Sequence, residues 1–293
     1  TEQRWRTLIA LLDDPRLYGR DLTAPLRSLA RGGAIFGLAS LEAHRSSSEA
    51  LQLAEQLEHS GVSLDRVYAD QVRTVHYGYR GDVALHRRYL ERAELHAIGR
   101  GTTWQIETWS PGPMLSLALR LHDPLMAKRA GEQMRRLSES LPSLVPHARH
   151  MRGAYLLLSG RHAQALPWLE AVLQEKPRSR TAWGHSHGVL ARAYNKLGDH
   201  ARAQAACQRA IAHGVDEDFG FTHLNLIVQT ELAIASAGLG QQAQAEQQLR
   251  ALHVLHDPDQ NPLIIGTLHE AELDVALLAG DLVAARTQLL NME

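Results

Sequence analysis

The sequence has few cysteines and aromatic residues, and it carries no excess of charge. Its 293 residues include one cysteine and three phenylalanines, aromatic residues make up 5%, and the formal net charge is −1. The single cysteine, Cys207, excludes an internal disulfide and a zinc cluster built from cysteines. It occupies an apolar position of a helical pattern, so we expect it to be buried.

The balance of 31 basic and 32 acidic side chains argues against a nucleic-acid partner, whose binding surface would show as a basic excess or stripe. The densest basic patch contains Arg87, Arg88 and Arg92, but Glu91 and Glu94 interrupt it. We interpret this patch as a solvated helix face.

Long apolar runs and alternating patterns are missing as well. No run approaches 18 apolar residues, so the sequence predicts no membrane-spanning helix and no membrane partner. No segment long enough for a strand alternates between polar and apolar residues, which predicts an all-α fold. Since no signal peptide opens the chain at Thr1, we expect a cytoplasmic protein. The chain stops where a helix ends, without a polar capping helix, so we expect it to be a piece of a longer protein or a processed one.

Helical hairpins with small residues are what the sequence contains in abundance. The clearest lies within residues 182–213, where apolar residues at helical spacing precede and follow a turn at Gly198. Gly198 can adopt the left-handed conformation that ends the first helix, and Asp199 can cap the second. Ala203, five residues past Gly198, has no side chain beyond Cβ, so the two helices can approach closely there.

Six further segments have the same organisation. The turns lie at or near residues 45, 81, 122, 160, 198, 240 and 280, with spacings of 36, 41, 38, 38, 42 and 40. Five residues after the turn, six of the seven units carry alanine, and His86 is the exception. These alanines are Ala50, Ala127, Ala165, Ala203, Ala245 and Ala285. A lone hairpin cannot bury its apolar faces, so the pattern predicts stacked antiparallel hairpins over residues 35–293 rather than an irregular helical bundle. Residues 1–34 fit the repeat poorly and are expected to form diverged terminal helices or a link to an upstream domain.

The hairpin pattern resembles the tetratricopeptide repeat (TPR). Residues that match the family's aromatic, small and proline positions are Tyr194, Gly198, Ala203 and Ala210 and, one unit earlier, Gly153, Gly160, Ala165 and Pro177. The family's unit has about 34 residues, whereas the units here have 36 to 42. The resemblance implies a right-handed superhelical solenoid of about seven antiparallel hairpins.

The longer units are similar to the C-terminal sensor arrays of bacterial signal-transduction ATPases of the STAND type. Such arrays stand behind kinase, cyclase or DNA-binding effector modules, as in the maltose regulator. The resemblance implies a non-catalytic signalling module that binds a protein or peptide partner in its concave groove. It further implies that binding is relayed to an effector domain outside this chain.

The resemblance also implies where a partner binds, because the first helix of each TPR hairpin lines the concave groove. The family's groove positions, counted back from each turn, select thirteen residues here. They are Tyr68, Gln71, Tyr79, Trp109, Arg120, His147, His150, His185, Arg192, Asn195, Lys196, Glu270 and Asp274. A groove of this composition suits an extended acidic peptide or a polar small molecule.

Three of these residues form the most specific site hypothesis. Arg192, Asn195 and Lys196 are three and four residues apart, so they can project from one helix face. We expect Arg192 and Lys196 to bind a carboxylate of the partner, and their removal to weaken binding with little loss of fold stability.

Seventeen histidines are the one unusual feature of the composition. His185 and His187 are two residues apart and point about 200° apart on a helix, so they cannot share a metal ion. His253 and His256 are three apart, but no carboxylate or cysteine completes a ligand set nearby in the sequence. HExxH and kinase signatures are also missing. We therefore expect neither enzyme activity nor a cofactor or bound metal. One alternative is a small-molecule sensor, which a pocket enclosed by the superhelix would favour. A second alternative is a metal-dependent enzyme built on helical repeats, which histidines and carboxylates clustered around one cavity would favour.

Overall fold

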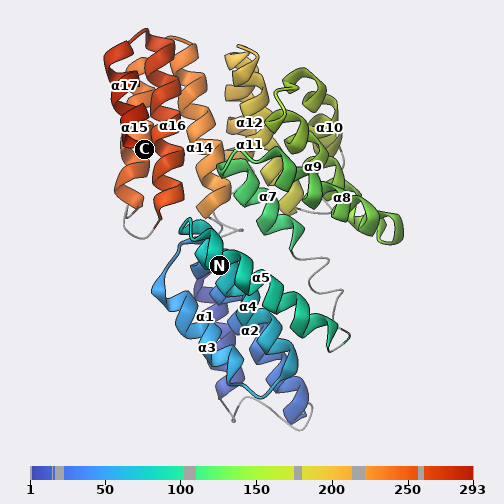
Figure 1. The fold of residues 1–293 in the computed structure, drawn as a ribbon. Coiled ribbons are helices and arrows are strands. Elements are labelled where there is room, and N and C mark those ends of the chain that lie inside the picture. The colour runs from blue at the N-terminus through green and yellow to red at the C-terminus, as the bar shows by residue number, and fades with distance from the viewer. Residues whose placement is uncertain are drawn as a thin grey trace. The chain divides into compact units, whose positions relative to one another are not determined.

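The structure, a computed structural model, describes residues 2–14, 16, 23–99, 101, 110–174, 180–212, 222–256 and 261–292. Helices hold 86% of this described part of the chain, and no strand occurs in it, which confirms the all-α prediction. None of its helices is both long and apolar enough to cross a membrane. The helices form two compact units, Thr1–Ile106 and Glu107–Glu293, and each is described by itself (Figure 1).

The first unit is built from α1 (Glu2–Asp13), α2 (Ala24–His44), α3 (Ser48–Glu58), α4 (Ser63–Tyr79) and α5 (Val83–Ile98). Consecutive helices pack together, and α2 also packs on α4. The start of the array expected at residue 35 falls inside α2, which continues through two glycines. A Cβ atom on Gly32 would overlap the Asp65 carboxylate of α4, so this glycine allows the close approach of the two helices.

A buried carboxylate organises the contact between α4 and α5. Asp70 is fully buried, and Nε of Arg92 lies 2.9 Å from each of its carboxylate oxygens. Arg92 also donates to Glu58 of α3 at 2.9 Å. Arg87 and Arg88 are exposed, as the sequence predicts, but the interpretation of Arg92 as part of a solvated face is wrong. The fold places the buried Asp70 opposite it, 22 residues earlier in the chain.

The second unit consists of helical hairpins that follow one another along the chain. The first helices of these hairpins are α7 (Pro111–Arg120), α9 (Val145–Leu158), α11 (Arg180–Lys196), α14 (Thr222–Gly238) and α16 (Pro262–Ala279). Their second helices are α8 (Pro124–Ser140), α10 (His162–Gln174), α12 (His200–Ala212), α15 (Gln242–Leu255) and α17 (Leu282–Asn291). A 3₁₀ turn, η1 (Pro142–Leu144), joins α8 to α9. Each first helix packs on its own second helix, and successive first helices also touch, so they form one layer (Figure 1).

The turns of all seven predicted hairpins lie at or next to the predicted residues. Five have a glycine in the left-handed region, with φ of 75° at Gly81, 72° at Gly160, 76° at Gly198, 80° at Gly240 and 73° at Gly280. In the two turns without glycine, Ser46 and His122 adopt φ of 52°. The turn placed near Arg45 is therefore centred one residue later. Asp82, Asp123 and Asp281 cap the helices that follow their turns with side-chain hydrogen bonds.

The alanines five residues past the turns lie at the helix crossings. Ala50, Ala127, Ala165, Ala203 and Ala245 are fully buried, and Ala285 is 5% exposed. His86, the exception, reaches back across its hairpin, with Nδ1 2.8 Å from the carbonyl oxygen of Thr74. This pattern confirms the register deduced from the sequence.

Cys207 is also fully buried in this core, as expected, and burial raises the pKa of its thiol.

Replacement of Ala203 by leucine should destabilise the second unit by roughly 1–3 kcal/mol, because the crossing has no room for the added carbons. Ala201→Leu is the matched control, since Ala201 is exposed on the same helix. Urea unfolding followed by circular dichroism measures the difference. Equal midpoints for the two variants would contradict the register.

Candidate functional site

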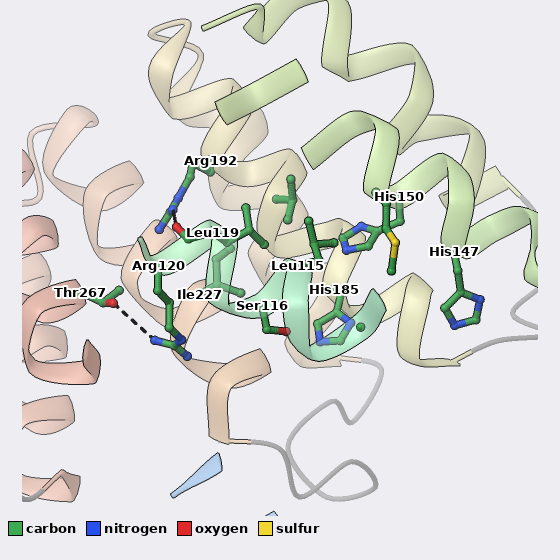
Figure 2. A pocket seen from close by; sticks show the side chains of 13 residues that line it. Leu115, Ser116, Leu119, Arg120, His147, His150, His185, Arg192, Ile227 and Thr267 are labelled. Carbon is green, nitrogen blue, oxygen red and sulfur yellow. Dashed lines mark hydrogen bonds between the residues drawn. The ribbon is translucent and has the colours of Figure 1, made fainter. Parts of the chain in front are cut away.

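The first helices of the second unit enclose a cavity of about 90 Å³ (Figure 2). Helices α7, α9, α11, α14 and α16 all contribute side chains to it. Its apolar lining consists of Gly112, Leu115, Leu119, Met151, Val189 and Ile227. Its polar lining consists of Ser116, Arg120, His147, His150, His185, Arg192 and Thr267. Some of the positions predicted for a groove thus line a partly enclosed, mostly apolar pocket in this unit.

Polar contacts join the end of α7 to α16 across the mouth of this cavity. Nη1 of Arg120 donates to Oγ1 of Thr267 at 3.4 Å (Figure 2). Nε2 of His122 lies 3.0 Å from Oε2 of Glu270. Burial raises the pKa of Glu270, but the hydrogen bond from His122 and the charge of Arg192 outweigh it and lower the pKa to about 2. Glu270 is thus a carboxylate at neutral pH and holds the two helices together.

A buried ion pair lies next to the cavity, between α11 and α14. Arg192 and Glu231 are 8% and 1% exposed, and Nε of Arg192 lies 2.5 Å from Oε1 of Glu231. Burial lowers the pKa of Arg192, but the neighbouring carboxylate of Glu231 reverses that effect and raises it. Asn195 adds hydrogen bonds from Nδ2 to the carbonyl oxygen of Glu231 at 2.9 Å and to its Oε2 at 3.0 Å. Nη1 of Arg192 also reaches the Leu119 carbonyl of α7 at 3.5 Å.

The structure therefore gives the basic side chains of α11 partners within the protein. Arg192 and Asn195 bind Glu231, and Nζ of Lys196 lies 2.9 Å from Oδ2 of Asp274 on α16. The expectation that removal of Arg192 costs little stability is wrong, because the buried Glu231 would lose its counter-charge. One feature of the sequence indicates this role. Glu231 is the only acidic residue of α14, a helix rich in apolar residues.

Three histidines line one side of the cavity. The rings of His150 and His185 stack with centroids 5.7 Å apart, and His150 Nδ1 lies 3.0 Å from Oγ of Ser186. Burial lowers the pKa of His147, and it lowers that of His150 to about 3, so both rings are neutral at pH 7. His187 instead packs edge-on against Trp183, with centroids 4.3 Å apart. His185 and His187 therefore go to different places, in agreement with the helical-wheel argument.

The three predicted residues in the first unit are packed into that unit's own core. Tyr68 stacks on Phe36 with ring centroids 4.2 Å apart, and Tyr79 meets the ring of His44 edge-on at 5.1 Å. Gln71 is 1% exposed, and neither of its amide atoms has a hydrogen-bond partner among the described residues. Trp109 lies outside the described residues. Of the thirteen predicted positions, the cavity brings together Arg120, His147, His150, His185 and Arg192.

Comparisons with known proteins agree with this architecture. A family model described as tetratricopeptide repeat matches residues 156–219. Among curated proteins, none matches the sequence. The fold is similar to the crystal structure of NprR in complex with its cognate peptide NprX, with a TM-score of 0.58 and 14% identity over 99% of this chain and 86% of that one. It is also similar to the crystal structure of Rap protein complexed with competence and sporulation factor, with a TM-score of 0.63 and 12% identity over 99% of this chain and 85% of that one.

The chain is a TPR-like helical repeat array. Identities this low establish similarity of the fold alone. They do not identify the groove residues of this chain, which follow only from its own geometry.

Arg192→Ala should destabilise the protein by about 3–5 kcal/mol, because it leaves the buried Glu231 carboxylate without a counter-charge. Lys196→Ala should cost only about 0–1 kcal/mol, since its pair with Asp274 is partly exposed. Urea unfolding of each variant measures both effects. Similar losses for the two variants would show that the Arg192–Glu231 pair does not stabilise the fold.

The stability of the protein should fall as the pH drops from about 6.5 towards 3, and His150 should contribute to the fall. Because burial lowers the folded-state pKa of His150 from 6.5 to about 3, only the unfolded state takes up this proton in that window. The slope from one such group is about 1.4 kcal/mol per pH unit. His76, whose pKa burial lowers to about 4, has an effect of the same sign, so the comparison is between wild type and His150→Gln. Parallel pH profiles for these two proteins would contradict the assignment.

Proposed function

We propose that the second unit is a non-catalytic module that binds an extended peptide bearing a carboxylate. The peptide lies along the first helices, places an apolar side chain in the cavity and its carboxylate beside Arg120. The observation that carries the proposal is the lining itself: a mostly apolar pocket with an arginine at its mouth and no carboxylate among its described lining residues.

The charges around the cavity favour an anionic group. Glu231 balances the charge of Arg192. Arg120 adds a second guanidinium to the lining, where it donates to the hydroxyl of Thr267, and the described lining residues include no carboxylate. The lowered pKa values of His147 and His150 keep these rings neutral, so they add hydrogen-bonding and stacking groups rather than charge. A partner carboxylate would form a charge-assisted hydrogen bond with Arg120.

The size of the cavity favours a peptide over a small molecule. A volume of about 90 Å³ is well below the roughly 300–1,000 Å³ of ordinary small-molecule pockets, and it suits a single inserted side chain. The two similar structures are complexes of NprR with its cognate peptide NprX and of Rap protein with competence and sporulation factor. Both complexes hold a ligand, which supports ligand binding by the similar fold of this chain.

The nearest approach to a catalytic arrangement at the cavity is Ser186 next to His150. Ser186 is fully buried, and a histidine with a pKa of about 3 cannot accept a proton from it near neutral pH. This supports a binding role. The relay to an effector outside this chain, in a cytoplasmic signalling protein, rests on the resemblance to bacterial sensor arrays.

The test is a screen of synthetic hexapeptides with free C-terminal carboxylates against the full chain, followed by fluorescence-anisotropy titrations of the peptides that bind. Arg120→Gln should weaken binding about tenfold or more, which corresponds to about 1.4 kcal/mol or more. Replacing the peptide's carboxylate by an amide should have a similar effect.

Arg202→Gln on α12 is the control, because Arg202 is exposed on a second helix and should leave the affinity unchanged. Equal weakening by this control, or indifference to loss of the peptide's carboxylate, would refute the proposed groove. Binding of no peptide in the screen would favour the small-molecule alternative.

A further inference from the structure

Two histidines and a glutamate converge between α15 and α16, on the last two hairpins of the second unit. His253 comes from α15, whereas His269 and Glu272 come from one face of α16, three residues apart. Nε2 of His253 lies 3.0 Å from Oε1 of Glu272, and Nδ1 of His269 lies 3.1 Å from Oε2 of the same carboxylate. Both imidazoles therefore aim one nitrogen at a single carboxylate.

The spacing of these atoms matches the needs of a small metal ion. One ligand atom from each residue lies within 4.8 Å of the others. A tetrahedral ion with bonds of about 2.0–2.1 Å separates its ligand atoms by about 3.3 Å. Each imidazole nitrogen already lies near that distance from one oxygen of the Glu272 carboxylate, His253 at 3.0 Å from Oε1 and His269 at 3.1 Å from Oε2. Small side-chain rotations would bring all three atoms into position.

We propose that His253, His269 and Glu272 bind one Zn²⁺ ion. Two imidazoles and a carboxylate are a ligand set that zinc accepts, with the remaining tetrahedral position open. Each ring can carry its proton on the nitrogen that faces away from the ion and so bind as a neutral ligand. No such cluster involving another set of residues occurs in the described part of the chain.

The surroundings offer a side chain for the open fourth position and a path by which the ion can enter. Oε1 of Gln288 on α17 lies 2.9 Å from Nδ1 of His269, so it is at hand to bind the ion or a water on it. A groove of about 430 Å³, bordered by Glu272 and Gln288, opens beside the cluster. The three ligands are half-buried, so the ion can enter from solvent and still be held by two helices.

The site is independent of the proposed peptide groove. Thr267 and Glu270 face the cavity side of α16, whereas His269 and Glu272 each lie two residues further along, about 200° around the helix. The ion would fasten α15 to α16, and its loss would leave the lining described above in place. Failure of one proposal therefore does not decide the other.

The test uses the full chain without a histidine tag, treated with a chelator and then titrated with Zn²⁺ in a calorimeter. We expect one tightly bound ion per chain. His269→Ala and Glu272→Gln should each weaken binding by more than about 100-fold, because loss of a ligand exceeds the cost of losing an outer-shell partner. Thermal unfolding in Zn²⁺ should shift upward for the wild type and not for these variants.

Cobalt substitution reports the geometry and guards against variants that fold poorly. Co²⁺ in the wild type should give the intense visible absorption of a tetrahedral site, and Glu272→Gln, which preserves the shape of the side chain, should lose it. His256→Ala is the matched control and should bind Zn²⁺ like the wild type, because His256 lies outside the cluster.

Undiminished binding in His269→Ala and Glu272→Gln would overturn the site, since the ion would then be held by other histidines. Equal weakening by His256→Ala would overturn the assigned ligands in favour of the pair adjacent in sequence.

Discussion

The structure depends on one steric constraint, the close crossing of two helices at a buried alanine five residues after the turn, which six of the seven hairpins share. Ala203 is fully buried where α11 packs on α12, and a larger side chain there would push the two helices apart. A buried alanine recurs at this position in six of the seven hairpins, from Ala50 to Ala285, and His86 takes its place in the hairpin of α4 and α5. Stacking of such hairpins in the second unit places α7, α9, α11, α14 and α16 around one cavity.

Apolar packing and buried charged side chains meet at the walls of that cavity, and removing those charges from water costs free energy. Burial of Arg192 and Glu231 removes both charges from water, and their contact, the bonds from Asn195 and the bond from Arg192 to the Leu119 carbonyl compensate for this. Such a pair contributes less to net stability than to a defined arrangement of the helices it joins. It fixes α11 against α14, while Arg120 of the cavity lining donates to the hydroxyl of Thr267.

The histidines illustrate how one residue type serves different purposes in one fold. Burial keeps His150 neutral beside the cavity, where it stacks on His185. His86 replaces a crossing alanine and bonds a backbone carbonyl of the preceding helix. His253 and His269 meet at a carboxylate, which is the arrangement from which we infer a zinc site. Their surroundings, rather than their number, distinguish these roles.

The sequence by itself determined the fold of this protein. Left-handed turn glycines such as Gly198 and crossing alanines such as Ala203 act through local backbone geometry and short-range sterics, which can be read from spacing along the chain. Five of the thirteen predicted groove residues line the cavity for the same reason, since helical periodicity decides which face a residue occupies. Spacing did not reveal that Tyr79 packs into its own unit's core, because burial depends on what stacks above a helix.

Only the tertiary structure decided which charges meet. Arg192 finds Glu231 39 residues later, Lys196 finds Asp274 78 residues later, and Arg92 finds Asp70 in the preceding helix. His253 on α15 pairs with Glu272, which lies on the following helix, α16. The spacing of residues within α15 cannot predict this pair. Side chains on different hairpins meet because whole helices stack. No local pattern in the sequence encodes which residues of the stacked helices become neighbours.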